Sequence, residues 1–220
     1  MIGKKVNKMG AYPMMLNMKN KAAVVVGGGT IAYRKTLGLL QAGADVTVIS
    51  PVLHSKMEVL FLNDQIMWKN KVFEPRDLQL AIVVIAATNQ PYVNELVASS
   101  AGNHQLVNVV DSRSLSDFHI PAKLERGHLT ITVATNGASP TLARVIRDEL
   151  VEKYDDSYKA YLDFLALARD QVKNASIDEQ TKLRLLKVIT DETYRQSHNM
   201  QQAFLEMIDD FEKKSHHQLI

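Results

Sequence analysis

Three consecutive glycines, at positions 27–29, directly follow the apolar run Ala22–Val26 and precede Thr30-Ile31-Ala32. Glycine loses more conformational freedom on folding than any other residue, so three in a row mark a tight turn or a close approach of the backbone to another group. The run before them is short, continuous and rich in valine, which is typical of a strand buried on both faces of a parallel sheet. A buried strand that ends in glycines and leads into a helix restricts the fold more than any other segment.

Further apolar runs repeat this pattern along the first half of the chain: Asp45–Ile49, a weaker run at 71–73, 81–87 and 106–110. Between the first two strands, segment 33–44 has leucines at helical spacing and reaches Gly43, a residue type common just after a helix. Between the last two, Pro91 suits a first helical turn and Gly102 a helix end. The alternation predicts a doubly wound, Rossmann-like parallel sheet over residues 1–111.

The pattern changes after this domain. Residues 119–124 and 129–134 resemble strands, and the segment 125–128 between them resembles a hairpin turn. From Pro140 onward apolar residues recur at steps of three and four, as on helices that bury one face. Ser176 and Glu179 fit a capping box for one of these helices. We therefore expect a small β-rich segment over residues 112–145 and an α-helical module over residues 146–220.

Composition excludes several function classes. The 26 basic and 24 acidic side chains leave a formal net charge of +2, too small a field to favour nucleic acid or a membrane surface as the partner. The chain has no cysteine, so thiolate catalysis and cysteine-ligated metal are excluded, and its histidines lack the H-E-x-x-H spacing. Neither a signal-peptide core nor an apolar stretch of roughly 20 residues is present. We expect a cytoplasmic protein that binds small molecules and no metal.

The glycine segment fits the dinucleotide-binding fingerprint G-x-G-x-x-G/A. Gly27 permits the tight turn, Gly29 lets the backbone approach a pyrophosphate, and Ala32 lets helix and strand pack closely. The N–H groups at the start of the helix attract phosphate. Because the pattern lies between an expected strand and an expected helix, we predict a dinucleotide site. The alternative is a tight turn with a purely structural role.

The acidic residue that usually follows this fingerprint is missing. It normally binds the ribose hydroxyls from a position about 20 residues further on. That place reads Ile49-Ser50-Pro51-Val52 here. Ser50 either bonds a ribose hydroxyl or is a plain surface residue. The residues at this strand end therefore favour neither NAD nor NADP.

Two further strand ends reach the carboxyl edge, where open α/β sheets bind ligands. Thr88 and Asn89 follow the fourth expected strand, and Asn89 either bonds the nicotinamide or ribose of a dinucleotide or is a turn residue. Asp111 follows the fifth strand and is either a catalytic carboxylate or a strand cap. Asp117 is a weaker catalytic candidate, since it lies in a less regular segment.

A possible anion site lies further along the chain, where Ser139 and Pro140 suit the N-cap and first position of a helix. Arg144 and Arg147 follow on the first turns of that helix. A ligand rich in carboxylates can dock at such a helix end, or these residues can serve the helix alone.

Three segments together resemble one family: VVVGGGTIAYRKTLGLLQAGADVTVISP, AATNQPYVN with LVNVVD, and IPAKLERGHLTITVATNGASPTLARVIRDEL. In this order and spacing they closely resemble the siroheme-synthase dehydrogenase family, the NAD-dependent precorrin-2 dehydrogenases. The resemblance covers about residues 12–150, and the helical tail is similar in layout more than in motif.

The resemblance implies NAD-dependent oxidation of precorrin-2 to sirohydrochlorin in a homodimer. The segment at about 112–145 would pair across the two-fold axis, and the helical tail would help to wall the cleft. Contacts with NAD would include Thr30-Ile31 and Pro51-Val52, so the missing acid looks like a family trait. The residues expected to bind the cofactor are Gly27, Gly29, Thr30, Ile31, Ala32, Ser50, Pro51, Val52, Thr88 and Asn89.

The resemblance also implies roles in catalysis and substrate binding. Asp111 matches the catalytic acid/base, and Ser139 matches a serine at the tetrapyrrole pocket. With Asn108 and Arg144, Ser139 is expected to bind the substrate, whose acidic side chains suit arginine. Because some family members also insert iron into sirohydrochlorin, one alternative is a bifunctional dehydrogenase and ferrochelatase. Another is a non-catalytic, NAD(H)-sensing dimer.

Overall fold

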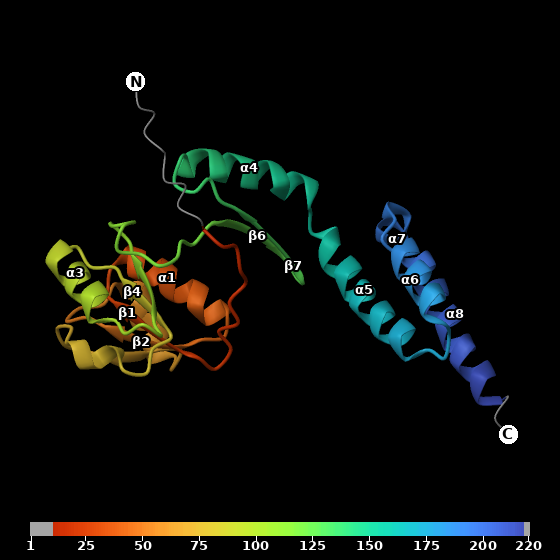
Figure 1. The fold of residues 1–220 in the computed structure, drawn as a ribbon, viewed down its shortest axis with the longest axis horizontal. Helices are drawn as coiled ribbons and strands as arrows, with labels where there is room; N and C mark the ends of the chain where they lie inside the picture. Colours follow the sequence, from red (N-terminus) through yellow and green to blue (C-terminus); the bar gives the residue numbers. More distant parts are fainter. Residues whose placement is uncertain (1–10, 218–220) are drawn as a thin grey trace, which may run out of the picture. The chain divides into compact units, whose positions relative to one another are not determined.

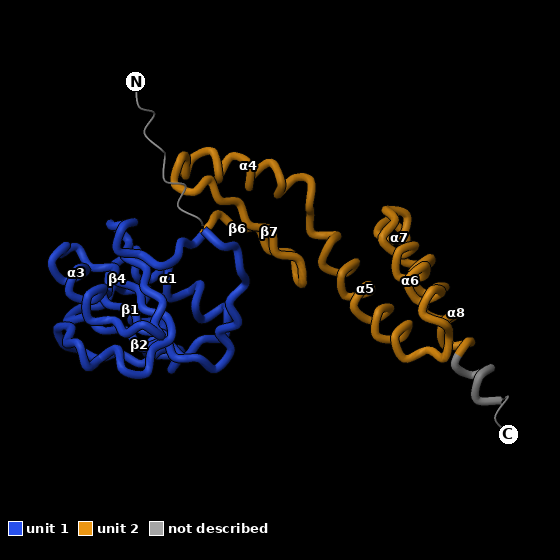
Figure 2. Tube along the Cα trace, viewed as in Figure 1, with its two compact units in different colours: residues 1–120 blue, residues 121–220 orange. Residues whose placement is uncertain are grey.

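The computed structural model describes residues 11–217, with side chains as far as residue 211. The chain divides into two compact units, residues 1–120 and 121–220 (Figure 1, Figure 2). The outer ends of the domains expected from the sequence, at 1–10 and 218–220, lie outside the described residues. Among the helices of residues 11–217, none combines the length and apolarity needed to cross a membrane.

The first unit contains a five-stranded parallel sheet with the order β3-β2-β1-β4-β5. Its strands are β1 (Ala22–Val26), β2 (Asp45–Ile49), β3 (Met67–Lys69), β4 (Val83–Ala86) and β5 (Leu106–Val109). The order reverses between β1 and β4, and such a reversal opens a crevice at the carboxyl ends of the two strands. The Rossmann-like parallel sheet predicted from the sequence is therefore confirmed.

Helices cover both faces of this sheet (Figure 1). They are α1 (Thr30–Gln41), α2 (Ser55–Leu62), the short 3-10 helix η1 (Pro75–Leu78) and α3 (Pro91–Ser100). Val25 packs in one cluster with residues of α1 and α2, whereas its neighbours Val24 and Val26 pack in the other with residues of η1 and α3. Successive strand residues face opposite sides, so burial on both faces requires the continuous valine run.

The strand expected at 71–73 was wrong, because β3 lies earlier, at Met67–Lys69. Its central residue, Trp68, donates its indole N–H to the Ser50 carbonyl oxygen at 2.8 Å and packs, partly buried, against the core cluster on that face. Lys71 instead forms ion pairs, at 3.2 Å with Glu74 and 3.1 Å with the Asp77 carboxylate, whose side chain is 4% exposed. The apolar pattern was misleading here because charge pairing, not strand pairing, organises this segment.

The segment after β5 folds back along the free edge of that strand. The Val107 N–H donates to Asp117 Oδ2 at 2.9 Å, and the Val109 N–H donates to Ser116 Oγ at 2.9 Å. These side chains occupy positions that a further strand would otherwise fill, which protects the sheet edge. Asp117, the weaker catalytic candidate, therefore has a structural role at this edge.

The second unit begins with an antiparallel hairpin of β6 (Ala122–Arg126) and β7 (Leu129–Val133). The turn contains Gly127 at φ +55°, in the left-handed region that glycine tolerates best. The helix α4 (Pro140–Lys153) packs against both strands. The hairpin expected from the sequence is thus confirmed, but its first strand begins three residues later and ends two residues later than expected, and its second strand is one residue shorter.

Four helices complete this unit: α5 (Ser157–Asn174), α6 (Glu179–Val188), α7 (Glu192–Gln196) and α8 (His198–His217). Their core contains Tyr161, Phe164, Ile189, Phe204 and Ile208 among other buried residues. Helix α5 packs with each of the other three, which Figure 1 shows as a group of helices beside it.

The capping box expected at Ser176 and Glu179 was wrong. Asp178 is the N-cap of α6, and its carboxylate accepts from the Thr181 N–H at 3.0 Å and from the Thr181 hydroxyl at 2.7 Å. These hydrogen bonds lower the pKa of Asp178. A carboxylate that accepts two hydrogen bonds is a stronger cap than the serine hydroxyl two residues earlier.

Candidate functional site

The glycine turn meets the end of β4 at the point where the strand order reverses. Gly27 has φ +124°, and a Cβ added to it would lie 2.3 Å from the Ala87 carbonyl oxygen. Only glycine fits such a position without a backbone shift. The tight turn predicted for Gly27 is therefore present, and it lies in the crevice where folds of this type bind dinucleotides.

Gly28 has a second spacing role, which the sequence analysis missed. A Cβ on Gly28 would lie 2.0 Å from the Val52 carbonyl oxygen and 2.7 Å from Ser50 Oγ. The Gly28 carbonyl also accepts from the His54 N–H at 2.7 Å. The loop after β2 therefore lies directly against the glycine turn. One indication of this role is present in the sequence: glycine stands at position 28, where the fingerprint G-x-G-x-x-G/A accepts any residue.

Gly29 differs from its two neighbours because it faces open space. A Cβ added there would meet no atom of the described residues within 4 Å. Gly29 is the N-cap of α1, and no side chain of the described residues caps the helix. The first N–H groups of α1 are thus available to an anion, while Ala32 is fully buried against the sheet. This arrangement fits the pyrophosphate of a dinucleotide.

Two exposed apolar side chains flank the glycine turn. Ile31 is 52% exposed on the first turn of α1, and Val52 is 73% exposed in the loop after β2, next to the exposed Pro51. Ser50 is turned inward, with its hydroxyl donating to the Val52 carbonyl at 2.7 Å. Exposed apolar surfaces beside a helix N-terminus suit the base of a nucleotide. The contact predicted between Ser50 and ribose stays a prediction.

The ends of β4 and β5 are joined by hydrogen bonds through Asn94, a residue of α3. The Asn94 amide nitrogen lies 3.1 Å from each carboxylate oxygen of Asp111 and 3.2 Å from the Thr88 carbonyl oxygen. The Asn94 carbonyl oxygen accepts from the Thr88 N–H at 3.1 Å and from the Thr88 hydroxyl at 2.8 Å. Asn94 is 1% exposed, whereas Asp111 is exposed. The Asp111 carboxylate is thus exposed to solvent and is held in place by hydrogen bonds from the buried Asn94 amide.

Asn94 was not among the residues singled out from the sequence. The signal was weak: a polar residue stands between Val93 and Val97, which both pack in the core cluster on this face of the sheet. A buried asparagine needs partners for its amide group, and such a residue on the inner face of a helix is informative for that reason.

The other predicted residues lie in different surroundings. Asn89 is exposed in the turn after β4. Asn108 is 6% exposed, and its amide donates to the Phe118 carbonyl at 3.0 Å. In the second unit, the N-cap Ser139 accepts from the Leu142 N–H at 3.1 Å, and Arg144 is exposed on the same helix. The structure brings Thr88 and Asp111 together, and the roles of Asn108, Ser139 and Arg144 stay predictions.

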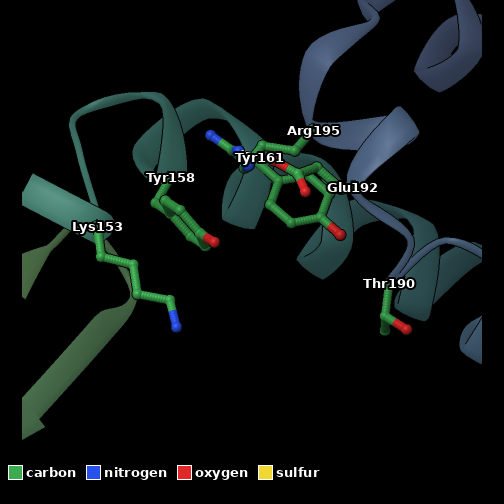
Figure 3. Close-up of a pocket in the computed structure, with 6 residues that line it drawn as sticks. All are labelled: Lys153, Tyr158, Tyr161, Thr190, Glu192 and Arg195. Atoms are coloured by element: carbon green, nitrogen blue, oxygen red, sulfur yellow. Dashed lines mark hydrogen bonds and ion pairs between the residues drawn. The ribbon is translucent and has the colours of Figure 1, made fainter. Parts of the chain in front are cut away.

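The second unit contains a concavity of about 200 Å³ (Figure 3). Tyr158 and Tyr161 lie between Lys153 and Thr190 in this view. The Arg195 guanidinium lies 4.9 Å from the Tyr158 ring centre, and its pairing with Glu192 raises the pKa of Arg195. Because this cation is already paired within the unit, the concavity is a weaker candidate site than the carboxyl edge of the sheet.

The fold and this edge define a nucleotide-binding protein of the Rossmann type with a fixed carboxylate beside the crevice. Family models match the chain in three consecutive parts: an NAD(P)-binding domain over residues 14–122, the sirohaem biosynthesis protein central domain over 126–153 and the SirC C-terminal domain over 158–204. The chain belongs to the family of precorrin-2 dehydrogenases and siroheme synthases, which confirms the resemblance seen in the sequence.

Individual relatives agree with this assignment. The chain is 36% identical over 200 residues to the precorrin-2 dehydrogenase of Priestia megaterium. This match covers 91% of this chain and 99% of that protein. It is 38% identical over 164 residues to the siroheme synthase of Xylella fastidiosa (strain M12), but the match covers 34% of that protein. The solved structure of "SirC, precorrin-2 dehydrogenase" superimposes with a TM-score of 0.82 at 36% identity, covering 91% of this chain and 100% of that one.

Proposed function

We propose that this chain is an NAD-dependent dehydrogenase that oxidises precorrin-2 to sirohydrochlorin in siroheme biosynthesis, and that it acts in the cytoplasm. One observation carries the proposal. A dinucleotide-type turn at Gly27 and Gly29 shares a sheet edge with the tethered carboxylate of Asp111, in a chain that matches the full length of a precorrin-2 dehydrogenase.

The reaction removes a hydride and a proton from precorrin-2, and NAD⁺, when bound, accepts the hydride. The residues of this chain have two tasks. The N-terminus of α1 and the open space at Gly29 hold the pyrophosphate, while Ile31 and Val52 contact the nucleotide. The exposed Asp111 carboxylate takes the proton and passes it to solvent.

We propose further that the chain works as a homodimer, with Asn108, Ser139 and Arg144 contacting the substrate. Support for a dimer comes from the hairpin and α4, where Leu124 and Ala143 are buried but Leu142 and Val145 are 49% and 47% exposed. A two-stranded hairpin is marginal by itself, so a further apolar surface would stabilise this region. Analytical ultracentrifugation tests the proposal, because Val145→Asp should convert a dimer to a monomer. A wild-type monomer at assay concentration would contradict it.

The function is tested by an anaerobic assay with freshly generated precorrin-2 and NAD⁺. We expect NADH and sirohydrochlorin, each followed by its absorbance, to form in equal molar amounts. Binding of NAD⁺ without turnover would instead favour the NAD(H)-sensing alternative. Enzyme-dependent loss of the metal-free spectrum after addition of Fe²⁺ would establish the bifunctional alternative.

A glycine variant tests the cofactor site separately from catalysis. Gly29 has φ −85°, an ordinary value for any residue, and its Cβ position is open, so Gly29→Val should fold. The added side chain would occupy the space assigned to the pyrophosphate and should raise the Kd for NAD⁺ at least about tenfold. The matched control is Gly38→Ala, further along α1, where an added Cβ also meets no described atom within 4 Å. Unchanged NAD⁺ affinity in Gly29→Val would refute the assignment.

A further inference from the structure

Asn94 uses every polar atom of its side chain. Its carbonyl oxygen faces the Thr88 N–H, which can only donate. Its amide nitrogen faces the Thr88 carbonyl and the Asp111 carboxylate, whose oxygens accept. The partners therefore determine the orientation of the amide. Because Asn94 is 1% exposed, its amide group is shielded from water.

The two ends of this connection belong to different parts of the site. Thr88 belongs to the turn after β4, and that turn includes Ala87, the residue against which Gly27 packs. Asp111 follows β5 and is exposed. Without a partner, an exposed aspartate samples several rotamers. Asn94 restricts this freedom, because one amide nitrogen lies 3.1 Å from both carboxylate oxygens.

We propose that Asn94 is a positioning residue: it holds the Asp111 carboxylate in a fixed orientation relative to the turn after β4, the turn beside which NAD⁺ would bind. The inference rests on the proposed function, in which Asp111 removes the proton. Asn94 is 1% exposed, so its role would be to act through Asp111 rather than to contact a ligand directly. Misplacing a reacting group by about 1 Å can slow a reaction by about 10²-fold, so a fixed carboxylate matters for the rate.

Asn94 can also have a purely structural role as a buried amide, and the chain offers a matched control for that role. Gln105 is 6% exposed and lies at the amino end of β5, whereas Asp111 follows the carboxyl end of the same strand. Its side chain likewise has backbone partners, the carbonyls of Leu78 and Ala81 and the N–H of Gly102. Gln105→Leu removes a comparable buried amide far from the carboxyl edge.

The test compares Asn94→Leu, Gln105→Leu, Asp111→Ala and the double variant Asn94→Leu/Asp111→Ala in the full-length protein. For each, we measure NAD⁺ affinity, kcat and KM for precorrin-2, and the folded fraction. We expect Asn94→Leu to lower kcat about 10²-fold. Because Asn94 also holds the turn at Thr88, NAD⁺ affinity should fall as well, but by less than kcat. Because Asn94 acts through Asp111, adding Asn94→Leu to Asp111→Ala should cause no further loss.

Asn94→Asp provides a second variant in case Asn94→Leu folds poorly. It keeps the size of the side chain and its acceptor toward Thr88, but it places a second carboxyl group against Asp111. Two adjacent carboxylates share a proton, so the acid limb of the pH profile of kcat should move to higher pH by about one unit or more. Gln105→Leu should leave this profile unchanged, as any purely structural effect would.

The outcomes separate the two proposals. A wild-type protein that binds NAD⁺ but does not oxidise precorrin-2 overturns the proposed function, and the inference about Asn94 with it. If the wild type turns over and folded Asn94→Leu keeps its kcat, the positioning role is wrong and the function stands. The positioning role is also wrong if Asn94→Leu slows the Asp111→Ala enzyme further, or if Asn94→Asp leaves the pH profile unchanged.

Discussion

The two units of this protein differ in how they bury apolar surface. In the first, a sheet is covered on both faces, and buried residues form one cluster on each side. In the second, the helices from α5 onward share a core around Tyr161 and Phe164, while the hairpin and α4 bury little apolar surface. The first unit therefore buries apolar surface on both sides of its sheet, whereas the hairpin region leaves Leu142 and Val145 about half exposed.

The units also differ in where they use carboxylates. In the first, Asp77 is buried, and although burial by itself raises its pKa, hydrogen bonds from the Glu74 N–H, Lys71 and Lys69 lower it overall. In the second, Asp178 and Asp191 are exposed caps whose pKa values are lowered by hydrogen bonds from Thr181 and Thr193. A buried ion pair is costly to disrupt, and an exposed cap contributes less.

The largest expected effect tests whether the chemistry belongs to the first unit. Asp111→Ala should slow precorrin-2 oxidation about 10²–10⁴-fold, the usual loss for an acid–base group, with NAD⁺ affinity retained. Single-turnover kinetics would measure it. Asp117→Asn is the matched control, since that carboxylate caps the edge of β5 and its loss should lower stability but leave kcat unchanged. Wild-type kcat in Asp111→Ala would remove Asp111 from the mechanism.

The next effect concerns the buried carboxylate of the first unit. Asp77→Asn should lower the free energy of unfolding by about 3 kcal/mol at pH 7, because Lys69 and Lys71 lose a buried partner. The folded-state pKa of Asp77 lies below its ordinary value of 3.8, so its stabilisation is present above that pH and disappears as the pH falls through the lowered value. Urea unfolding of both proteins should therefore converge in acid. A difference that does not depend on pH would argue against this ion pairing.

A smaller effect tests the contact between the glycine turn and the loop after β2. Gly28→Ala should destabilise the protein by about 2 kcal/mol, because the added Cβ would lie 2.0 Å from the Val52 carbonyl oxygen. Gly38→Ala lies within α1 with space for a Cβ, and it should instead stabilise by up to about 1 kcal/mol. Thermal unfolding of the two variants measures both, and equal effects would contradict the close approach at Gly28.

The smallest effect lies in the second unit. The buried Tyr161 hydroxyl donates to the Ile189 carbonyl at 2.8 Å, and burial raises the pKa of Tyr161. Tyr161→Phe should lower stability by about 1 kcal/mol and leave NAD⁺ affinity as in the wild type. Calorimetry and a binding titration test this. A change in NAD⁺ affinity would show that the units are energetically coupled and would weaken the comparison.

Local patterns predicted most of the elements. The valine runs located β1 and β2 to the residue, and Gly43, at φ +77°, follows α1 as expected. The missed strand β3 has three residues, too few for a periodic pattern, and only Trp68 of these packs against a core cluster. For the site, position at strand ends singled out Thr88 and Asp111, but no local pattern connected them.

The sequence by itself determined the strand-turn-helix order and the turn that glycine permits at position 27, since each depends on residues close together in the chain. It also determined the family, through the order and spacing of three segments. The tertiary structure alone decided that Asn94 meets Asp111, 17 residues further on, and that Gly28 meets Val52. These contacts depend on which strands lie side by side and on how closely α3 packs against the sheet. The periodicity of a single segment predicts neither the strand order nor the packing distance of α3. The hydrogen bonds between Asn94 and Asp111 could therefore be recognised only in the folded chain.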